Sequence, residues 1–365
     1  MKKILIASAV LMAAPAMADV VLYGQIKGGV GYTKGEGSGS LTQMEDYKSR
    51  IGFKGTEDLG NGMQAFWQVE QFTPISGAEQ SMGWNNRDTF VGVKGDFGAV
   101  RAGYISDVMN EAGEHKLLLD PWETGFNADN PRGNGAFVRI DKRWQGVRYD
   151  SPDFGGFKFN VQHQLADSAT EGNLTAASTV RQATIVSGKY VNSGFEVHGA
   201  YGQYKQQNID GNGDLDDGQI ARVIGAYRAN GVVASLAYQY TDGFRGLWAK
   251  NSFATTAQDP QARIHNPVET HEVLGLFSYN MGSITPRISY SHGFDEKHKN
   301  GGKVSNSGYD QVIVGADYAL SKRTTALASF GWKNAPVGYK VDANGKVSGD
   351  DRDSYSAGVG LRHVF

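Results

Sequence analysis

The chain has 365 residues, among them 49 Gly, 9 Pro and no Cys, and its 36 basic residues nearly balance its 38 acidic ones. High glycine without matching proline argues against a disordered linker protein. The absence of cysteine excludes disulfide frameworks, thiolate metal sites and a thiol nucleophile. A mean hydropathy of −0.42 and the lack of any apolar run of about 18 residues exclude membrane-spanning helices. No excess of positive charge favours nucleic acid as a partner.

Residues 1–18 have the three parts of a secretory signal peptide. Met1-Lys2-Lys3 is a short cationic start, residues 4–14 are mostly apolar, and Ala16-Met17-Ala18 has the small-x-small pattern of a cleavage site. The apolar part is too short to remain as a membrane span. We therefore expect cleavage after Ala18 and export of the rest of the chain from the cytoplasm of a Gram-negative cell.

From Asp19 onward the hydrophobic pattern repeats every two residues, as in strands with one apolar and one polar face. In the first such segment Val20 and Leu22 share one face, whereas Gln25 and Lys27 share the other. The alternation recurs to the C-terminus in segments of about ten residues, a length typical of strands that cross a bilayer. Only residues 110–119 come near a helical pattern. The sequence therefore predicts an all-β chain.

Short turns and long polar segments alternate between these predicted strands. The short turns, six of the seven with glycine, suit tight hairpins and lie at residues 58–61, 95–98, 152–155, 192–194, 229–231, 280–282 and 321–323. The long polar segments lie near residues 33–46, 73–86, 106–138, 167–179, 206–218, 242–269, 294–308 and 335–352. Seven short and eight long connections join sixteen strands.

This sorting of the connections favours a membrane barrel over a soluble β-sandwich. Outer-membrane barrels have short periplasmic turns and long external loops, and closure of the sheet satisfies the backbone groups that lipid cannot. Sixteen strands enclose an aqueous lumen. We therefore predict that residues 19–365 form one domain, a 16-stranded antiparallel transmembrane β-barrel.

Aromatic residues near the predicted strand ends are expected to form an outward-facing belt at the membrane interfaces. They are Tyr104, Trp144, Tyr149, Tyr190, Tyr227, Tyr238, Tyr240, Tyr279, Tyr290, Tyr318 and Trp332.

Six stretches together resemble the trimeric Gram-negative porins of the neisserial and related beta-proteobacterial type. They are DVVLYGQIKGGV (19–30), SRIGFKGTEDLGNGMQAFWQVE (49–70), NRDTFVGVKGDFGAVRAGY (86–104), VRYDSPDFGGF (147–157), YALSKRT (318–324) and GVGLRHVF (358–365). They include both termini of the mature chain and most of its short turns, so the resemblance covers essentially all of that chain. The long polar segments contribute nothing to it.

The resemblance implies a homotrimer in the outer membrane, a long third external loop folded into the lumen, and passive diffusion of ions and small hydrophilic solutes. It also implies that the terminal Phe365 belongs to the signal read by the barrel-assembly machinery, and that lipid and lipopolysaccharide surround the barrel. In this family the loop at 73–86 latches over the adjacent protomer. Together with the outward-facing Gly24 and Gly28 it suggests a trimer contact, although strand curvature explains the glycines equally well.

Strand alternation places eight basic side chains on the lumenal face, a set that we call the basic wall: Lys27, Lys48, Arg50, Lys54, Lys94, Arg101, Arg148 and Arg362. The segment 106–138, which corresponds to the third loop, carries six acidic residues: Asp107, Glu111, Glu114, Asp120, Glu123 and Asp129. If this loop folds inside, the wall faces an acidic strip across a narrow throat, where charges are weakly screened and select ions. The basic excess predicts a mild anion preference, and exchange of Arg50 and Arg101 for Ser should reduce it.

Two other classes of function remain as alternatives, an outer-membrane enzyme and a structural or adhesive barrel. His271-Glu272 begins like a zinc motif, but Gly275 stands where the second His belongs, and no other catalytic, metal-binding or cofactor-binding pattern is present. We therefore predict no enzyme activity, no metal and no cofactor. Specific uptake is a variant of the channel hypothesis: sugars would require an aromatic lumenal track, which alternation does not locate, and phosphate would require clustered lumenal arginines, which are partly present. Stepwise conductance in a planar bilayer separates a channel from the other two classes.

Overall fold

The protein is described by a computed structural model. It describes residues 19–35, 40–76, 87–109, 115–119, 122, 143–167, 179–208, 218–245, 267–298, 302–303, 305, 307–336, 340–341, 347–348 and 351–365. The predicted signal peptide therefore lies outside the described residues, and its cleavage stays a prediction.

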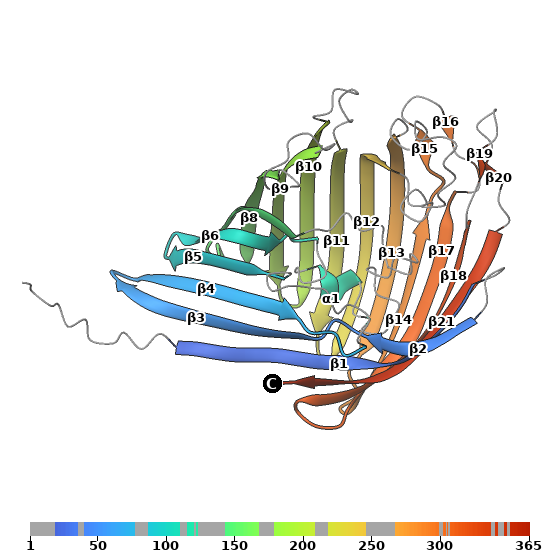
Figure 1. The fold of residues 1–365 in the computed structure, drawn as a ribbon, viewed down its shortest axis with the longest axis horizontal. Coiled ribbons are helices and arrows are strands. Elements are labelled where there is room, and N and C mark those ends of the chain that lie inside the picture. Colours follow the sequence, from blue (N-terminus) through green and yellow to red (C-terminus); the bar gives the residue numbers. More distant parts are fainter. Residues whose placement is uncertain are drawn as a thin grey trace, which may run out of the picture.

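Sixteen long strands form one closed antiparallel barrel, as the sequence predicted (Figure 1). They are β1 (Asp19–Gly35), β3 (Arg50–Gly60), β4 (Met63–Phe72), β5 (Thr89–Gly95), β6 (Gly98–Ser106), β7 (Arg143–Asp150), β8 (Phe157–Asp167), β9 (Thr179–Asn192), β10 (Phe195–Asn208), β11 (Gly218–Ala229), β12 (Val232–Arg245), β13 (Pro267–Tyr279), β14 (Ile284–Gly293), β17 (Tyr309–Ala319), β18 (Thr324–Pro336) and β21 (Asp351–Val364). Each strand pairs with its neighbours along this order, and β21 pairs with β1 to close the sheet.

Short elements extend the external side of the barrel. They are β2 (Ser40–Asp46), β15 (Lys297–His298), β16 (Gly302–Lys303), β19 (Lys340–Val341) and β20 (Val347–Ser348). The one-turn helix α1 (Lys116–Leu119) lies inside the barrel instead (Figure 1). β2 pairs with the C-terminal part of β1, toward the external side, and β3 pairs with its N-terminal part. Most of the segment 33–46 is thus strand and not the loop that we expected. The apolar alternation fades there, but the backbone pairing continues.

A break between β2 and β3 interrupts the alternation of side chains at residues 47–49. Lys48 has a positive φ of 71°, and the Ser49 hydroxyl is bonded to both the backbone N–H and the carbonyl of Lys27 on β1. Strand alternation therefore does not define the direction of Lys48, unlike the other seven members of the basic wall.

The seven short turns lie where the sequence predicted them. At Ser193-Gly194 and Asn230-Gly231 both central residues have positive φ, between 50° and 85°. Two consecutive positive φ values match the twist of the flanking strands, and Asn and Gly tolerate them at low cost. These turns join β9 to β10 and β11 to β12.

The C-terminal residue completes the closure of the barrel. The backbone of Phe365 exchanges two hydrogen bonds of 3.1 Å with Gly24 on β1. A Cβ added to Gly24 would lie 2.6 Å from the Phe365 ring, and one added to Gly28 would collide with Ile75. Both outward-facing glycines therefore receive side chains of their own chain, an explanation that neither of our two expectations included.

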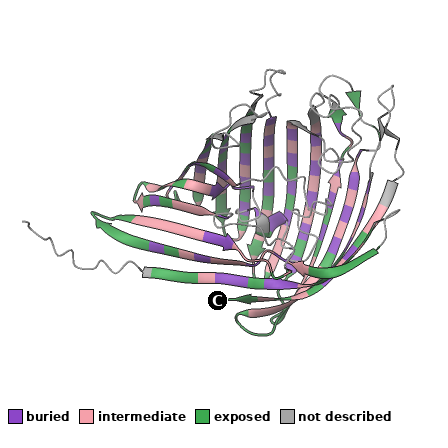
Figure 2. Cartoon of the chain, viewed as in Figure 1, coloured by how far each residue is buried: buried purple, intermediate pink, exposed green. Residues whose placement is uncertain are grey.

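The two faces of the barrel differ as alternation requires, with buried and more exposed residues following one another along the central strands such as β11 (Figure 2). The outward face is apolar and accessible, as at Leu236, which is 74% exposed. Most members of the expected aromatic belt face outward, including Tyr190, Tyr279 and Tyr318. The expectation for Trp144 was wrong: it faces the lumen and is only 2% exposed.

Candidate pore constriction and its charged wall

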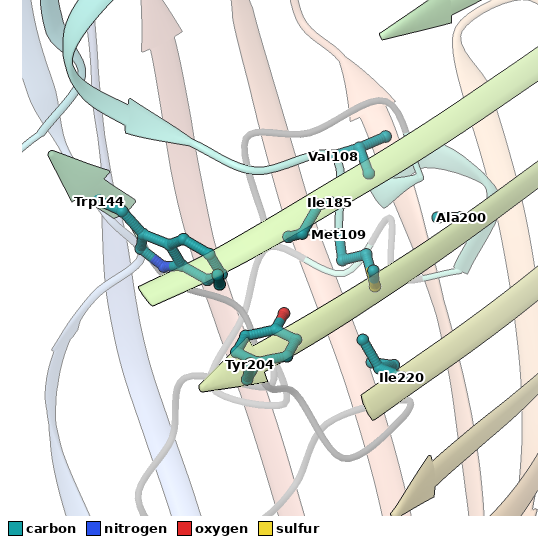
Figure 3. Packing of buried hydrophobic residues seen from close by; sticks show 8 residues of the cluster. Val108, Met109, Trp144, Ile185, Ala200, Tyr204 and Ile220 are labelled. Atoms are coloured by element: carbon teal, nitrogen blue, oxygen red, sulfur yellow. The ribbon is translucent and has the colours of Figure 1, made fainter. Parts of the chain in front are cut away.

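The third loop enters the barrel just after β6. Val108 and Met109 are buried against lumen-facing side chains of β7, β9, β10 and β11 (Figure 3). Trp144 and Tyr204 meet there edge to face, with ring centroids 5.2 Å apart. The Arg222 guanidinium also donates to the backbone carbonyl of Met109 at 3.5 Å.

Two further contacts attach the loop to the wall along β11 to β17. Leu118 and Leu119 of α1 pack in one cluster with four lumen-facing residues, Ile224, Ala237, Leu274 and Leu276. The Ser235 hydroxyl donates to the carbonyl of Leu118. Trp122 packs on Ile313, and its indole N–H donates to the Ser289 hydroxyl at 2.9 Å. For the described residues of the third loop, the predicted fold into the lumen is thereby confirmed.

These contacts explain why several lumen-facing residues are apolar in a barrel whose interior is otherwise polar. Exposed to lumenal water, the buried side chains of Ile185, Ile220 and Leu274 would each forgo about 1.5–3 kcal/mol of burial free energy. Our sequence analysis missed this docking surface. A signal was present, because β13 carries apolar residues on both faces between residues 273 and 277.

Seven members of the basic wall lie on the lumenal face. In each strand pair the register places inward-facing residues opposite inward-facing residues, so the same assignment of faces holds around the barrel. Arg50 and Lys54 share it with Glu70 and Gln68 on β4, and Lys27 is directly opposite Arg362. Arg101 is directly opposite Arg148 across β6 and β7. These neighbouring cations would repel one another without counter-charges.

Carboxylates on the same wall provide those counter-charges, and each is shared by two basic residues. Glu70 binds Arg87 at 2.5 Å and Arg50 at 3.2 Å. Asp150 binds Arg101 at 2.8 Å and Arg148 at 2.7 Å. Each group of three thus contains two arginines and one carboxylate.

The pattern recurs on the other strands. Asp317 binds Arg287 at 2.6 Å and lies 3.9 Å from Arg362. Glu196 binds Arg228 at 2.7 Å, and His198 at 2.9 Å. Sequence analysis had not assigned these wall carboxylates. Strand alternation indicates that these carboxylates face the lumen. Which basic residues they pair with depends on the register between strands.

Lys54 and Lys94 differ from the arginines, since neither has a carboxylate partner among the described residues. Their ammonium groups lie over aromatic rings instead, that of Lys54 at 5.1 Å from the Tyr23 centroid and that of Lys94 at 5.7 Å from the Phe66 centroid. A ring attracts a cation without cancelling its charge. These two lysines therefore retain their full charge at the lumen surface.

The acidic strip expected on the third loop is described at one residue only. Asp107 is fully buried, and its carboxylate accepts a hydrogen bond of 2.8 Å from the backbone N–H of Met109. Asp107 thus shapes the loop's entry into the barrel. The other five acids, Glu111, Glu114, Asp120, Glu123 and Asp129, lie outside the described residues.

A histidine contact lies between the two apolar anchors of the loop. His115 is 1% exposed and meets His198 of β10 edge to face, with centroids 5.5 Å apart. Burial, reinforced by the nearby positive charge of Arg222, holds the pKa of His115 well below its usual value. The imidazole is therefore neutral where it packs.

The barrel, the inward third loop and the paired lumenal charges can now be set beside known proteins. The chain matches the family described as Gram-negative porin over residues 5–337. It belongs to the Gram-negative porin family. The protein is therefore a porin of the Gram-negative outer membrane, which it crosses with its strands.

Relatives of similar length support this membership. The chain is 38% identical to the major outer membrane protein P.IB of Neisseria sicca and 37% identical to that of Neisseria meningitidis serogroup B, each alignment covering 100% of both chains. It is 33% identical to the P.IA protein of Neisseria meningitidis serogroup A, over 98% of both chains. The resemblance to neisserial porins is thus confirmed.

Solved structures confirm the fold. An anion-selective porin from Comamonas acidovorans superposes with a TM-score of 0.65 at 22% identity, over 95% of this chain and 100% of that chain. The trimer form of OmpT from Vibrio cholerae superposes with a TM-score of 0.62 at 12% identity, over 95% and 99%.

Proposed function

We propose that this porin is a homotrimeric diffusion channel for ions and small hydrophilic solutes, with a mild preference for anions and no catalytic role. The observation that carries the anion preference is the sharing of each wall carboxylate by two basic residues, which leaves net positive charge along the lumen. The anion selectivity of the Comamonas relative and the trimer form of the Vibrio relative, both stated for those proteins, agree with the proposal.

The wall also suggests which charges set the preference. Arg50 and Arg101, which the sequence analysis selected, each share a carboxylate with a second arginine. Lys54 and Lys94 share none among the described residues, so a passing anion meets their charge undiminished. We assign the larger part of the anion preference to the two lysines.

The test is the reversal potential in a KCl gradient across a planar bilayer. Stepwise conductance with chloride more permeant than potassium supports the proposal. Lys54→Gln and Lys94→Gln should each lower the permeability ratio about two- to fivefold, because a unit charge at 4–8 Å in water is worth about 0.5–1 kcal/mol. Arg50→Ser with Arg101→Ser should lower it less. Cation preference of the unmodified channel would contradict the proposal. Absence of conductance would favour the two alternatives, a structural or adhesive barrel and an outer-membrane enzyme.

The assembly partners belong to the same proposal. The Phe365 ring lies over Gly24 at the closing seam, where recognition by the barrel-assembly machinery would act on the last strand. Phe365→Ala should slow barrel insertion in cells, with refolding into detergent as the control for stability. The outward apolar face fits outer-membrane lipid and lipopolysaccharide. Migration of unheated protein as a monomer in mild-detergent gels would count against the trimer.

A further inference from the structure

Three aromatic side chains lie on the lumenal face of β1, β4 and β5, in the wall that the described parts of the third loop leave uncovered. Tyr23 is on β1, Phe66 on β4 and Phe90 on β5. The register places Tyr23 directly opposite Gly52, Phe66 opposite Gly92, and Phe90 opposite Gln68. Our sequence analysis found no lumenal aromatic track, because Phe66 adjoins the outward-facing Ala65 and Trp67 and hides the alternation.

Glycines let two of these rings lie close against the wall. A Cβ added to Gly92 would lie 2.7 Å from the Phe66 ring, and one added to Gly52 would collide with the ring of Tyr23. Phe66 and Phe90 also meet edge to face, with centroids 5.8 Å apart. Phe66 and Phe90 therefore form one platform on the wall, and Tyr23 lies against the same wall two strands away from Phe66.

Each ring carries a cation. Besides Lys54 over Tyr23 and Lys94 over Phe66, the Arg101 guanidinium lies 5.1 Å from the Phe90 centroid. All three distances fall within the range of about 6 Å in which a cation and a ring attract. Ammonium donors that no carboxylate among the described residues engages thus stand directly beside aromatic surface.

A hollow opens at the periplasmic end of this track. Its volume is about 370 Å³, and Gln64, Lys94, Ala99, Asp150 and Ser151 are among the residues that line it. The hollow is open, and Lys94 is the member of the track that lines it. The Asp150 carboxylate is already bound by Arg101 and Arg148, so it does not oppose an anion there.

We propose that the track of Tyr23, Phe66 and Phe90 with Lys54, Lys94 and Arg101 is a binding site for small aromatic carboxylates in transit, a proposal that rests on the channel function above. The carboxylate pairs with a lysine ammonium, and the arene contacts the rings. Inorganic anions gain nothing from the rings. Neutral sugars gain nothing from the ammonium charges, so neither class uses both halves of the arrangement.

The test compares three carboxylates as blockers of chloride current through single channels in KCl at neutral pH. Benzoate has the charge and an aromatic ring, cyclohexanecarboxylate has the same charge and a saturated ring, and acetate has the charge alone. Benzoate should reach half-block at a concentration about two- to tenfold lower than cyclohexanecarboxylate, the range expected for an aromatic contact beyond its buried area. Acetate should block least.

Matched variants assign the effect to the track. Phe66→Leu with Phe90→Leu should remove the difference between benzoate and cyclohexanecarboxylate, whereas Phe330→Leu, on the outward face, should retain it. Lys94→Gln should weaken block by both ring carboxylates. Lys158→Gln, at the periplasmic end of β8 and paired with Asp153 at 3.4 Å, should not.

The possible outcomes separate this site from the channel function. Absence of chloride steps would refute the channel itself. Normal chloride steps with equal block by benzoate and cyclohexanecarboxylate would overturn the aromatic site and leave the channel intact. Unchanged benzoate block in the Phe66→Leu/Phe90→Leu channel would also overturn it.

Discussion

The two sides of the lumen follow the same strand alternation but carry different chemistry. Along β9 to β14 and β17, apolar residues such as Ile224 and Leu276 face inward, and the third loop covers them. Along β21, β1 and β3 to β6, the large inward side chains are mainly basic, aromatic or polar, with glycines between them, and most are partly exposed. One side holds the loop in place, and the opposite side is left to meet the solutes.

This difference teaches that the constriction depends on both walls. Apolar packing on one side holds the described part of the third loop, and in the proposed function the charge on the other side sets the ion preference. The two properties should therefore separate under mutation, with loop attachment responding to volume and to buried charge, and selectivity responding to the basic wall.

The largest effect is expected where the loop is attached farthest from its origin. Trp122→Ala removes the contact with Ile313 and the hydrogen bond to Ser289, and should weaken attachment by about 3–5 kcal/mol, as for other buried aromatic truncations. Single-channel currents should become noisier, with more frequent partial closures. Trp332→Ala, on the outward face, is the control. Equally quiet currents in the Trp122 variant would contradict the role of the apolar wall.

A smaller effect should appear with pH, through His115. When the loop is attached, burial keeps the pKa of this imidazole well below its usual value, whereas in the detached loop the pKa returns to about 6.5. Only the detached state then takes up the proton as pH falls below about 6.5, so attachment weakens by up to about 1.4 kcal/mol per pH unit. Above that pH the stabilisation is constant.

Current noise recorded at neutral pH and at pH near 5 measures this dependence. The groups that face His115 are Arg222, His198 and Lys189, and His115→Gln should remove its own contribution. If the noise of His115→Gln rises with acid as steeply as that of the unmodified channel, another group is responsible.

The smallest effect concerns the basic wall and runs in the opposite direction to the lysine variants. Asp150→Asn removes the carboxylate shared by Arg101 and Arg148, so the anion permeability ratio should rise about two- to fivefold on the same Coulomb estimate. Asp153→Asn, in the exposed periplasmic turn, is the matched control. A reversal potential unchanged by Asp150→Asn would show that ions do not sense this part of the wall.

Much of the fold was readable because it depends on local patterns. Alternation predicted the strands and the lumenal direction of Arg50, Lys54 and Lys94. The residues of the short turns, such as Asn230-Gly231, predicted the hairpins. The exception at residues 33–46 arose because strands above the membrane have water on both sides, so pairing continues there without apolar alternation.

The candidate site was less predictable, since its properties come from contacts between distant segments. The inward apolar face of β13, the lumenal place of Trp144 and the platform of Phe66 and Phe90 all follow strand alternation but break the rule that apolar side chains face outward. Each depends on a partner far along the chain, as Trp144 depends on Met109, which lies in the same buried cluster.

The sequence by itself determined the barrel, its sixteen strands, its likeness to porins and the excess of inward basic residues, because hydrophobic periodicity and turn residues act over neighbouring positions. Only the tertiary structure decided which cations are neutralised, which lie on aromatic rings and which wall the third loop covers. Those outcomes depend on the register between strands and on packing across the lumen, where charges and rings far apart in the chain come within a few ångströms of one another.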